Sequence, residues 1–468
     1  MKTLHDWFRH IVHNDVKVMA IGGSDPGGGA GIQQDIRTVT VLGGYGSGIP
    51  TALTVQNSLG VEDVSPVDSL YLERQLENCL SDIQFDAIKI GMILTKENVE
   101  AISKVLTRYA QGIPVVLDPV LSSKNEKALL KEEALKVFFD KILPVVTVIT
   151  PNIPEAKRLL GDEDDQTIDQ EELGKRLFKL IDGLTQRDIA VIIKGGHGTE
   201  GEKVKDVLVD RDGKVAIYGQ RIATTHSHGT GCAYASSLAT FLGAHVSLRD
   251  AMRLAREFIE ISLRESSSLG AGIGPVNTLT ILKRAYEREI VIGALKDACS
   301  RLESHPKAGL LCPEIQINLG YALSAASQKH DIAAFPGRIV RIGTQLTRVR
   351  EPEFGASSHV ANIILTAMRF DPSIRSAMDI KMSDQFLEKA NRVGLKVAFF
   401  SRKDEPKNIK EIEGSSLSWG VKTAIEANQG LVPDLIWDDG DIGKEPAIRV
   451  LGKDPLDVVK KALSLIEG

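Results

Sequence analysis

Short apolar runs alternate with helix-like stretches from Val16 to about Pro275, and this alternation limits the fold more than any other feature. Each run is continuously apolar, as is typical of strands that helices cover on both faces of a parallel sheet. We therefore predict an α/β fold with a mainly parallel sheet between two helical layers. The runs are Val16–Ile21, Ile49–Val55, Ala87–Ile90, Val115–Leu117, Val145–Ile149 and Ile189–Ile193.

A glycine-rich break at Gly270–Pro275 ends this pattern, and a charged helix is predicted to follow it at Leu279–Leu302. The segment beyond this helix is long enough for a core of its own. We place a domain boundary inside or just after the helix, near residue 290, and predict an arm at residues 1–15, a first domain at 16–288 and a second at 289–468. The strands predicted in the second domain are Arg338–Ile342, Val397–Phe400, Leu435–Trp437 and Ala447–Leu451.

The composition argues against several kinds of partner. The net charge is -5 at pH 7, whereas proteins that bind nucleic acid concentrate positive charge. No apolar run approaches the roughly 20 residues that a membrane span requires. The four cysteines are widely spaced, which argues against a disulfide framework or a zinc site and favours the cytoplasm. We expect small-molecule substrates, with no nucleic acid or membrane partner.

Two glycine-rich segments each precede a predicted helix: Gly23–Gly31 near the start of the chain and His228–Cys232 far downstream. Glycine lets the backbone approach a ligand closely, and free N–H groups at a helix start attract anions. The two segments predict a site for a small molecule and for a phosphoryl group that it receives. Asp35 and Gln56 are candidates to face the ring of that molecule, although Asp35 could equally serve the helix dipole.

Further polar residues follow the later strands, where open α/β sheets place their ligands. Asp118 ends one buried strand. Asn152 and Glu155 begin the next helix, where they could hold hydrated magnesium near nucleotide phosphates or form a capping box, and the two roles are compatible. Lys194 ends another strand and either reaches phosphate or is solvated.

The second glycine segment offers backbone N–H groups at Gly229, Thr230 and Gly231, which could stabilise a phosphoryl group in transfer. Cys232 follows in the first helical turn, where the helix dipole is expected to lower the pKa of the thiol. The alternative is a small residue packed under the loop.

These motifs together resemble the ribokinase superfamily and, within it, the hydroxymethylpyrimidine and phosphomethylpyrimidine kinases of thiamine biosynthesis. The motifs are GSDPGGGAGIQQD (Gly23–Asp35), TVQNSLGV (Thr54–Val61), KIGM (Lys89–Met92), VLDPV (Val116–Val120), TPNIPEA (Thr150–Ala156), KGGH (Lys194–His197) and HGTGC (His228–Cys232).

The resemblance implies a three-layer α/β/α kinase that uses ATP and Mg²⁺ and phosphorylates first the alcohol and then its monophosphate. Most ribokinase relatives carry Asp where this chain has Cys232, which the resemblance makes the catalytic residue. The resemblance assigns the other residues as follows: pyrimidine binding to Gly23, Asp35, Gln56 and Met92; ATP and phosphate binding to Asp118, Asn152, Lys194, Gly229, Thr230 and Gly231; the metal to Glu155.

The second domain contains two arginines on a predicted strand, Arg338 and Arg341. Because they are three residues apart, a regular strand would direct them to opposite faces. Ser357 or Ser358 is a plausible N-cap for the helix that follows. His359 then lies in the first turn, where a bound phosphate is favoured.

This segment resembles the thiamine-phosphate synthase domain found fused behind such kinases in archaea. The resemblance implies a three-layer α/β/α fold with a largely antiparallel sheet, and it makes Arg338 and His359 the catalytic pair. Asp379 stands where the family pattern has Asn, and Arg402 lacks the Asp that usually precedes it, so neither receives a role. The matching stretches are PGRIVRIG (Pro336–Gly343), FGASSHVA (Phe354–Ala361), SSLSWG (Ser415–Gly420) and GKEPAIRVLG (Gly443–Gly452).

We therefore predict a cytoplasmic, bifunctional enzyme of thiamine biosynthesis, which the families imply to be a homodimer. Its kinase would make the pyrimidine diphosphate, and its second domain would couple this product to thiazole phosphate, releasing pyrophosphate. One alternative is a second domain that only senses thiamine phosphates. Another is a kinase for pyridoxal or hydroxyethylthiazole.

Overall fold

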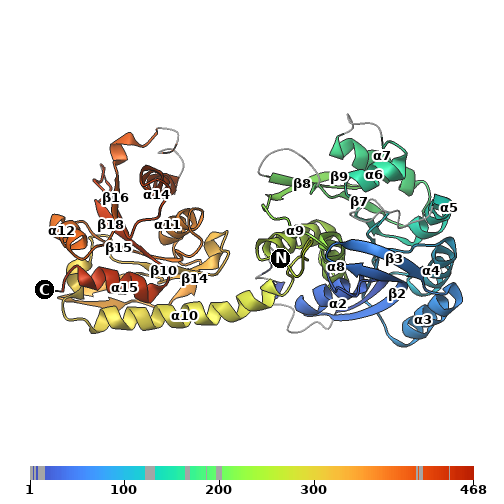
Figure 1. Cartoon of the computed structure of the whole chain (residues 1–468), viewed down its shortest axis with the longest axis horizontal. Helices are drawn as coiled ribbons and strands as arrows, with labels where there is room; N and C mark the ends of the chain where they lie inside the picture. Colours follow the sequence, from blue (N-terminus) through green and yellow to red (C-terminus); the bar gives the residue numbers. More distant parts are fainter. Residues whose placement is uncertain are drawn as a thin grey trace. The chain divides into compact units, whose positions relative to one another are not determined.

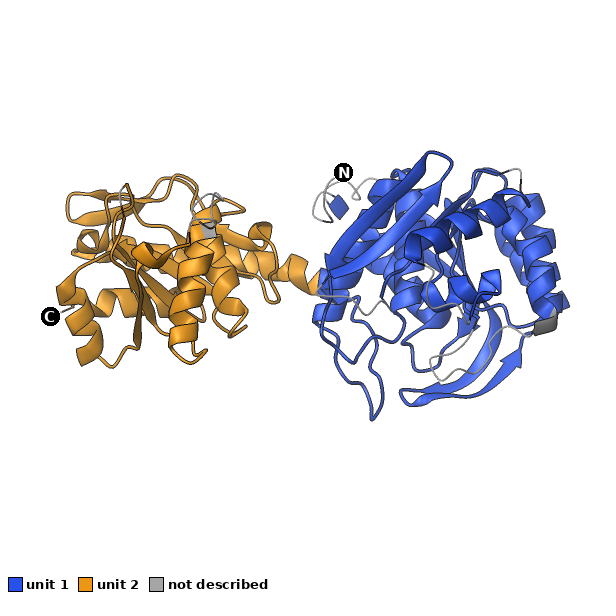
Figure 2. Ribbon diagram, turned by 90° about the horizontal axis from the view of Figure 1, so that it is seen from above, with its two compact units in different colours: residues 1–281 blue, residues 282–468 orange. Residues whose placement is uncertain are grey.

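The computed structural model describes residues 4, 7–8, 16–121, 132–163, 169–185, 187–196, 203–406, 409, 415–441 and 443–467. They form two compact units, Met1–Ile281 and Leu282–Gly468 (Figure 2). Helix α10 (Thr280–Ser304) contains the division between them. In the part of the chain just specified, no helix is long and apolar enough to cross a membrane.

Unit 1 is built on a nine-stranded sheet in the order β3-β2-β1-β4-β5-β6-β7-β8-β9. The six strands from β2 to β7 in this order pair in parallel, and an antiparallel strand or hairpin extends each edge. The strands are β1 (Lys17–Ser24), β2 (Tyr45–Asn57), β3 (Gly60–Pro66), β4 (Ala87–Ile90), β5 (Val115–Leu117), β6 (Val148–Ile149), β7 (Ala190–Ile193), β8 (Lys203–Asp210) and β9 (Gly213–Gln220).

Two apolar cores cover the faces of this sheet (Figure 1). One face packs against α3 (Ser69–Asp82), α4 (Lys96–Tyr109), α5 (Glu132–Val137), α6 (Ile153–Leu160) and α7 (Gln170–Asp182). The other packs against α2 (Gly31–Val41), α8 (Thr230–Gly243) and α9 (Leu248–Arg264).

Most of the predicted N-terminal arm, residues 1–15, lies outside the described residues. Leu4 and Trp7, which are described, are both buried in the core beneath α8 and α9. The Trp7 indole N–H donates to the carbonyl of Leu42 at 3.0 Å, and its ring meets that of Phe241 edge to face. These two side chains anchor the start of the chain to unit 1.

Unit 2 contains a seven-stranded sheet in the order β14-β11-β10-β15-β18-β17-β16. Every pair in it is antiparallel except β16 with β17. Two further strands, β12 (Ile339–Ile342) and β13 (Gln345–Arg348), form a separate hairpin. The strands of the main sheet are β10 (Leu319–Ala322), β11 (Ile332–Ala334), β14 (Glu353–Phe354), β15 (Ser376–Lys381), β16 (Val397–Phe400), β17 (Leu435–Asp438) and β18 (Ala447–Gly452).

Helices also cover both faces of the second sheet (Figure 1). Helices α10, α12 (Asp384–Arg392) and α15 (Pro455–Ser464) pack on one face, and α11 (Ser358–Met368) and α14 (Ser415–Ala427) on the other. The predicted fold classes of both domains, mainly parallel and then largely antiparallel, are confirmed.

Two sequence predictions about local structure are wrong. Val145–Ile149 is a strand only at Val148–Ile149, because Leu143–Val145 forms a 3₁₀ turn with Pro144 as its second residue. Arg338 was predicted to begin a strand, but β12 begins one residue later, at Ile339. Arg338 itself adopts a left-handed conformation with φ of 71°. The argument that Arg338 and Arg341 face opposite sides of one strand therefore does not apply.

A buried ion pair joins α9 to strand β8 in unit 1, and its loss should destabilise the unit. Arg256 donates from Nε to Asp206, which is fully buried, at 2.8 Å. Arg256→Ala leaves that carboxylate unpaired, so we expect a loss of about 3–5 kcal/mol in the free energy of unfolding, measured by thermal and denaturant unfolding.

Arg253→Ala, on the same helix, is the matched control. Arg253 pairs with Asp250 at a partly exposed position, where an ion pair contributes under about 1 kcal/mol. Equal losses in the two variants would contradict the prediction.

Candidate active sites of the two units

A cavity of about 1150 Å³ opens at the carboxyl ends of the parallel strands of unit 1. This is the edge at which open α/β sheets bind ligands. Asp35 is not on the cavity wall, but every other residue predicted for the kinase site is: Gly23, Gln56, Met92, Asp118, Asn152, Glu155, Lys194, Gly229, Thr230, Gly231 and Cys232.

The two glycine segments lie against each other at this edge. Gly229 has φ of 75°, and a Cβ there would lie 1.8 Å from the carbonyl oxygen of Gly29. A Cβ on Gly31 would likewise lie 2.2 Å from the carbonyl oxygen of Gly23. Only glycine fits at these two positions, so the starts of α2 and α8 meet backbone to backbone beside the cavity.

Three N–H groups of the first glycine segment are already occupied, which the sequence prediction of an open loop did not include. The Asp25 carboxylate accepts hydrogen bonds from the N–H groups of Gly27, Gly29 and Ala30 at 2.8–3.1 Å. The loop therefore already holds an anion of its own. Neither α2 nor α8 has a side-chain cap at its start, but the Asp25 carboxylate lies in the loop ahead of α2, so the start of α8 is the better place for a bound phosphate.

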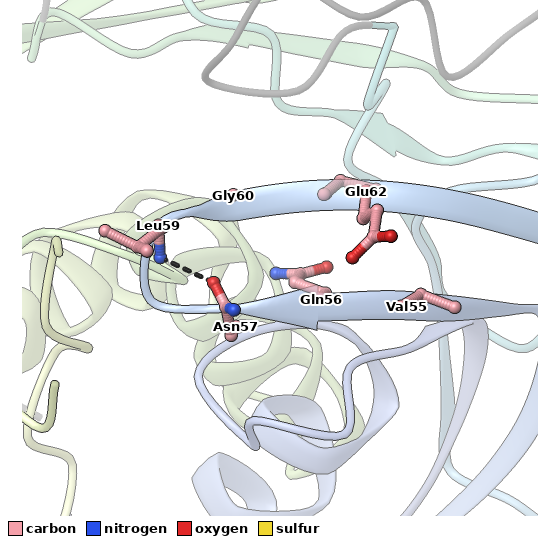
Figure 3. Close-up of a pocket in the computed structure, with 7 residues that line it drawn as sticks. Val55, Gln56, Asn57, Leu59, Gly60 and Glu62 are labelled. Carbon is pink, nitrogen blue, oxygen red and sulfur yellow. Dashed lines mark hydrogen bonds between the residues drawn. The ribbon is translucent and has the colours of Figure 1, made fainter. Parts of the chain in front are cut away.

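His228 links the loop to the β2–β3 hairpin. Its Nε2 lies 3.1 Å from Asp25 Oδ2 and 3.1 Å from Gln56 Nε2. Figure 3 shows the tip of the hairpin, where a smaller pocket of about 310 Å³ lies beside Gln56 and the Leu59 N–H donates to Asn57 at 2.8 Å. The hairpin, the first loop and the start of α8 are thus joined through one imidazole.

Asp35 lies behind the cavity wall and holds Lys89. The Lys89 ammonium donates to Asp35 at 2.8 Å, and the Ser236 hydroxyl donates to the other carboxylate oxygen at 2.7 Å. Both charged groups are fully buried. Burial lowers the pKa of Lys89, whereas the ion pair with Asp35 raises it. The ion pair outweighs burial, so the pKa of Lys89 lies above its ordinary value. Lys89 lines the cavity and carries a fixed positive charge there.

A second charged group lies beside the start of α8. Lys194 donates to Asp118 at 2.7 Å, so Lys194 is paired and not merely solvated. A Cβ on Gly231 would lie 3.1 Å from Asp118 and 3.4 Å from the Lys194 ammonium.

The predicted capping box is present, since Asn152 and Glu155 exchange hydrogen bonds of 2.8 Å.

The pKa of Glu155 is shifted by burial and by the charged groups around it. Burial and the nearby Asp118 carboxylate raise the pKa of Glu155 to about 7, although Lys194 opposes the change. Two carboxylates thus face one ammonium at this end of the cavity. That imbalance favours a further cation.

Cys232 departs from the sequence prediction. Burial, with the charges of Asp35 and Asp118 acting in the same direction, raises the pKa of the thiol to about 12 despite the opposing charge of Lys89. The predicted lowering by the helix dipole is therefore wrong, because desolvation of the thiolate outweighs it.

In unit 2, His359 pairs with Asp379, and the charge of Arg338 acts on the same carboxylate. His359 lies in the first turn of α11, behind the N-cap Ser357 that was one of two candidates. Its Nε2 is 3.0 Å from Asp379 Oδ2. Arg338 donates to the carbonyl oxygens of Ile315 and Gln316, and its charge also acts on Asp379.

Further buried charges continue from Asp379 across the sheet. Asp379 pairs in register with Arg449 on the neighbouring strand β18. Arg449 lies 2.5 Å from Asp438 Oδ2, and Arg402 donates to Asp438 Oδ1 at 2.6 Å. We call Asp379, Arg449, Asp438 and Arg402 the charge row. All four are buried.

Two family comparisons decide the identity of the units. Residues 25–277 match the family described as phosphomethylpyrimidine kinase, and residues 294–464 match thiamine-phosphate synthase ThiN. The chain belongs to the phosphomethylpyrimidine kinase family. Its second unit matches the ThiN family.

Individual proteins give the same result. The bifunctional thiamine biosynthesis protein ThiDN of Methanocaldococcus jannaschii is 31% identical over 448 residues, which cover 95% of this chain and 97% of that protein. ThiED of Geobacter sulfurreducens, a bifunctional thiamine biosynthesis protein, is 39% identical over 271 residues, 58% of this chain. The match spans about half of that relative, 54% of its length.

A solved pyridoxal kinase from Staphylococcus aureus, in complex with AMP-PCP and pyridoxal, is similar to unit 1. It has a TM-score of 0.50 and 29% identity, and the match covers 57% of this chain and 94% of that structure. A kinase bound to an ATP analogue supports ATP as the co-substrate of unit 1. The predicted bifunctional enzyme, a pyrimidine kinase joined to a thiamine-phosphate synthase, is confirmed.

Sequence reasoning assigned no role to several residues that build these sites. Asp25 and His228 lie inside quoted motifs, and an aspartate before a run of glycines is itself a turn signal. Lys89 is a charged residue within an otherwise apolar strand, as is Arg449. A charge in a buried strand requires a partner, and this signal could have found both.

The raised pKa of Cys232 predicts slow alkylation. Because the thiolate is the nucleophile, iodoacetamide should modify Cys232 on the order of 10³-fold more slowly than free cysteine at pH 8. The rate should also rise about tenfold per pH unit from pH 8 to 10, whereas that of free cysteine levels off. Mass spectrometry of the Cys232 peptide measures both. A rate that levels off below pH 9 would contradict the raised pKa.

Proposed function

We propose that the cavity of unit 1 binds the aminopyrimidine between the two glycine segments and transfers phosphoryl groups at the start of α8. Gly23, Gln56 and Met92 would hold the ring, and Asp35 would act by fixing Lys89. The N–H groups of Gly229, Thr230 and Gly231 would receive the transferring group. The observation that carries this proposal is the uncapped start of α8, which lies directly against Asp118 and Lys194.

The chemistry is a displacement at phosphorus. The substrate hydroxyl oxygen forms a bond to the γ-phosphorus of ATP while the bond to the ADP oxygen breaks, and the hydroxyl proton is released. Fixed positive charges, Lys89 and Lys194, and the helix-start N–H groups stabilise the charge that spreads over the phosphoryl oxygens. Because the free thiol keeps its proton at neutral pH, we assign Cys232 a contact with the reacting group and not the role of resting base.

The donors around Glu155 fit Mg²⁺. This ion is bound in kinases by one or two carboxylates together with phosphate oxygens and water, and the charges of Asp118 and Lys194, which pair at 2.7 Å, both act on Glu155. We propose that Glu155 holds the ion, with Asn152 orienting it and Asp118 facing the phosphates. When bound, Mg²⁺ would neutralise charge on the nucleotide phosphates.

In unit 2 we propose that Arg338 and His359 receive the diphosphate of the pyrimidine. The C–O bond at its methylene carbon breaks, and the electron pair leaves with the oxygen of pyrophosphate. The lone pair of the thiazole nitrogen then forms the new C–N bond. Arg338 and His359 would stabilise the leaving oxygens.

Three further proposals concern the whole chain. The boundary at residues 288 and 289 falls inside α10 and between the two family matches. Cytoplasmic location is supported by four unpaired cysteines. A homodimer is supported by exposed apolar side chains on the β2–β3 hairpin, Leu53, Val55 and Leu59, and light scattering of the purified protein tests it.

One assay tests the function. The full chain is incubated with hydroxymethylpyrimidine, ATP, Mg²⁺ and thiazole phosphate, and thiamine phosphate is the expected product. A parallel panel replaces the pyrimidine by pyridoxal or hydroxyethylthiazole, because the solved neighbour is a pyridoxal kinase. Faster turnover of either would overturn the pyrimidine assignment.

Arg338→Ala and His359→Ala should each reduce the formation of thiamine phosphate to a small residual rate and leave pyrimidine phosphorylation intact, because both residues lie in unit 2. The two activities are measured separately. Coupling is measured with the pyrimidine diphosphate supplied directly, so that it does not depend on the kinase. Equal loss of both activities would indicate misfolding, and retained coupling would contradict the assignment.

The raised pKa of Glu155 predicts how the metal requirement depends on pH. A carboxyl group with a pKa of about 7 is protonated below that pH, and protons then compete with the metal. The Mg²⁺ concentration for half-maximal kinase activity should therefore rise about tenfold per unit as the pH falls below about 7.

Glu155→Gln should remove this dependence and leave a high Mg²⁺ requirement at every pH. Glu97→Gln, which neutralises an exposed carboxylate at the start of α4, is the control and should behave as the unmodified protein. A Glu155→Gln enzyme with unchanged Mg²⁺ dependence would place the metal elsewhere.

A further inference from the structure

Among the described residues of unit 2, three buried polar atoms around the synthase site have no hydrogen-bond partner. They are Oδ1 of Asp379, Nε2 of His359 and Nε of Arg449. Buried polar atoms are normally satisfied, so their grouping in one place is unusual. Nε2 of His359 is at hydrogen-bond distance from Asp379 Oδ2, 3.0 Å, but is not aligned with it. Catalytic hydrogen bonds are often misaligned before substrate binds.

The charges explain why a carboxylate is held at position 379. Asp438 lies between two guanidinium groups, those of Arg449 and Arg402, so one positive charge of the charge row is left over. Asp379 balances it. Burial alone would raise the pKa of Asp379, but the charges of His359, Arg449 and Arg338 outweigh burial and leave the pKa below its ordinary value.

The burial of His359 shows how this carboxylate directs the ring. Nε2 has almost no exposed surface, yet the side chain as a whole is 35% exposed. The exposed part is therefore the remainder of the ring, on the side away from Asp379. The carboxylate holds one edge of the imidazole, and the other edge is open to a ligand at the start of α11.

We propose that Asp379 is a positioning residue for the synthase reaction, which fixes His359 through Nε2 so that the opposite edge of the ring meets the leaving diphosphate. The proposal rests on the coupling function proposed above. A carboxylate only accepts hydrogen bonds, so Asp379 cannot present a donor to the Nε2 proton, whereas an amide in its place could.

This arrangement matters most in the transition state. As the C–O bond breaks, the electron pair moves onto the diphosphate oxygen. With a proton on each ring nitrogen, Nε2–H faces Asp379 and Nδ1–H donates to that oxygen, more strongly in the transition state than in the bound substrate. A contact that strengthens in the transition state raises kcat and leaves KM nearly unchanged. Loss of Asp379 should therefore appear in kcat.

A double-mutant cycle in the full chain tests the proposal. Asp379→Asn should lower kcat for coupling about 10- to 100-fold and change KM for the pyrimidine diphosphate less than about twofold. In a His359→Gln background the same substitution should cause no further loss, because its effect passes through the imidazole. Kinase turnover and the melting temperature report folding, and Asp384→Asn, an exposed carboxylate of unit 2, is the matched control.

Four results would overturn the proposal or what it rests on. Unchanged kcat in Asp379→Asn, or an equal loss in both backgrounds, would leave Asp379 as a balancing charge only. Failure of the unmodified protein to form thiamine phosphate would instead overturn the coupling function, and the proposal with it. If Asp379→Asn does not fold, Asp379→Glu keeps the charge but moves the carboxylate, and its full activity would contradict positioning.

Discussion

The contact between the glycine segments of unit 1 determines where its chemistry can occur. At Gly229 a side chain would collide with the carbonyl of Gly29, so the two helix starts approach as bare backbone. Asp118, Lys194 and Lys89 lie around the start of α8, although they come from three different strands or directly follow them. Any side chain at position 229 would separate the substrate loop from the phosphate site.

Charge balance is the common principle of both units. Among the described residues of unit 1, the two lysines at the cavity each have a carboxylate partner, Lys89 with Asp35 and Lys194 with Asp118, and Glu155 shares the charge of Lys194 with Asp118. In unit 2 the charge row balances two arginines with two aspartates. Because an unpaired buried charge is costly, the ion pairs of unit 1 and the charge row of unit 2 fix the orientation of the side chains that a ligand meets.

Much of this could be predicted from the sequence, since continuous apolar runs and helix-start motifs are local signals. Ala87–Ile90, Val115–Leu117 and Val397–Phe400 are strands with the predicted bounds. Prediction failed where distant groups compete. The dipole argument for Cys232 considered only its helix and not its burial beside Asp35 and Asp118. The first glycine loop was predicted to be open because the sequence pattern alone does not show that the Asp25 side chain folds back onto its N–H groups. The pairing of His359 with Asp379 joins a helix to a strand and leaves no trace in spacing.

The aspartate that fills the first loop has a consequence for the order of events. With three of its N–H groups bound to Asp25, that loop offers less to an incoming phosphate than the start of α8 does. In the proposed kinase reaction the start of α8 would then receive the transferring group in both rounds. The monophosphate would have to turn its new phosphate toward that point before the second transfer.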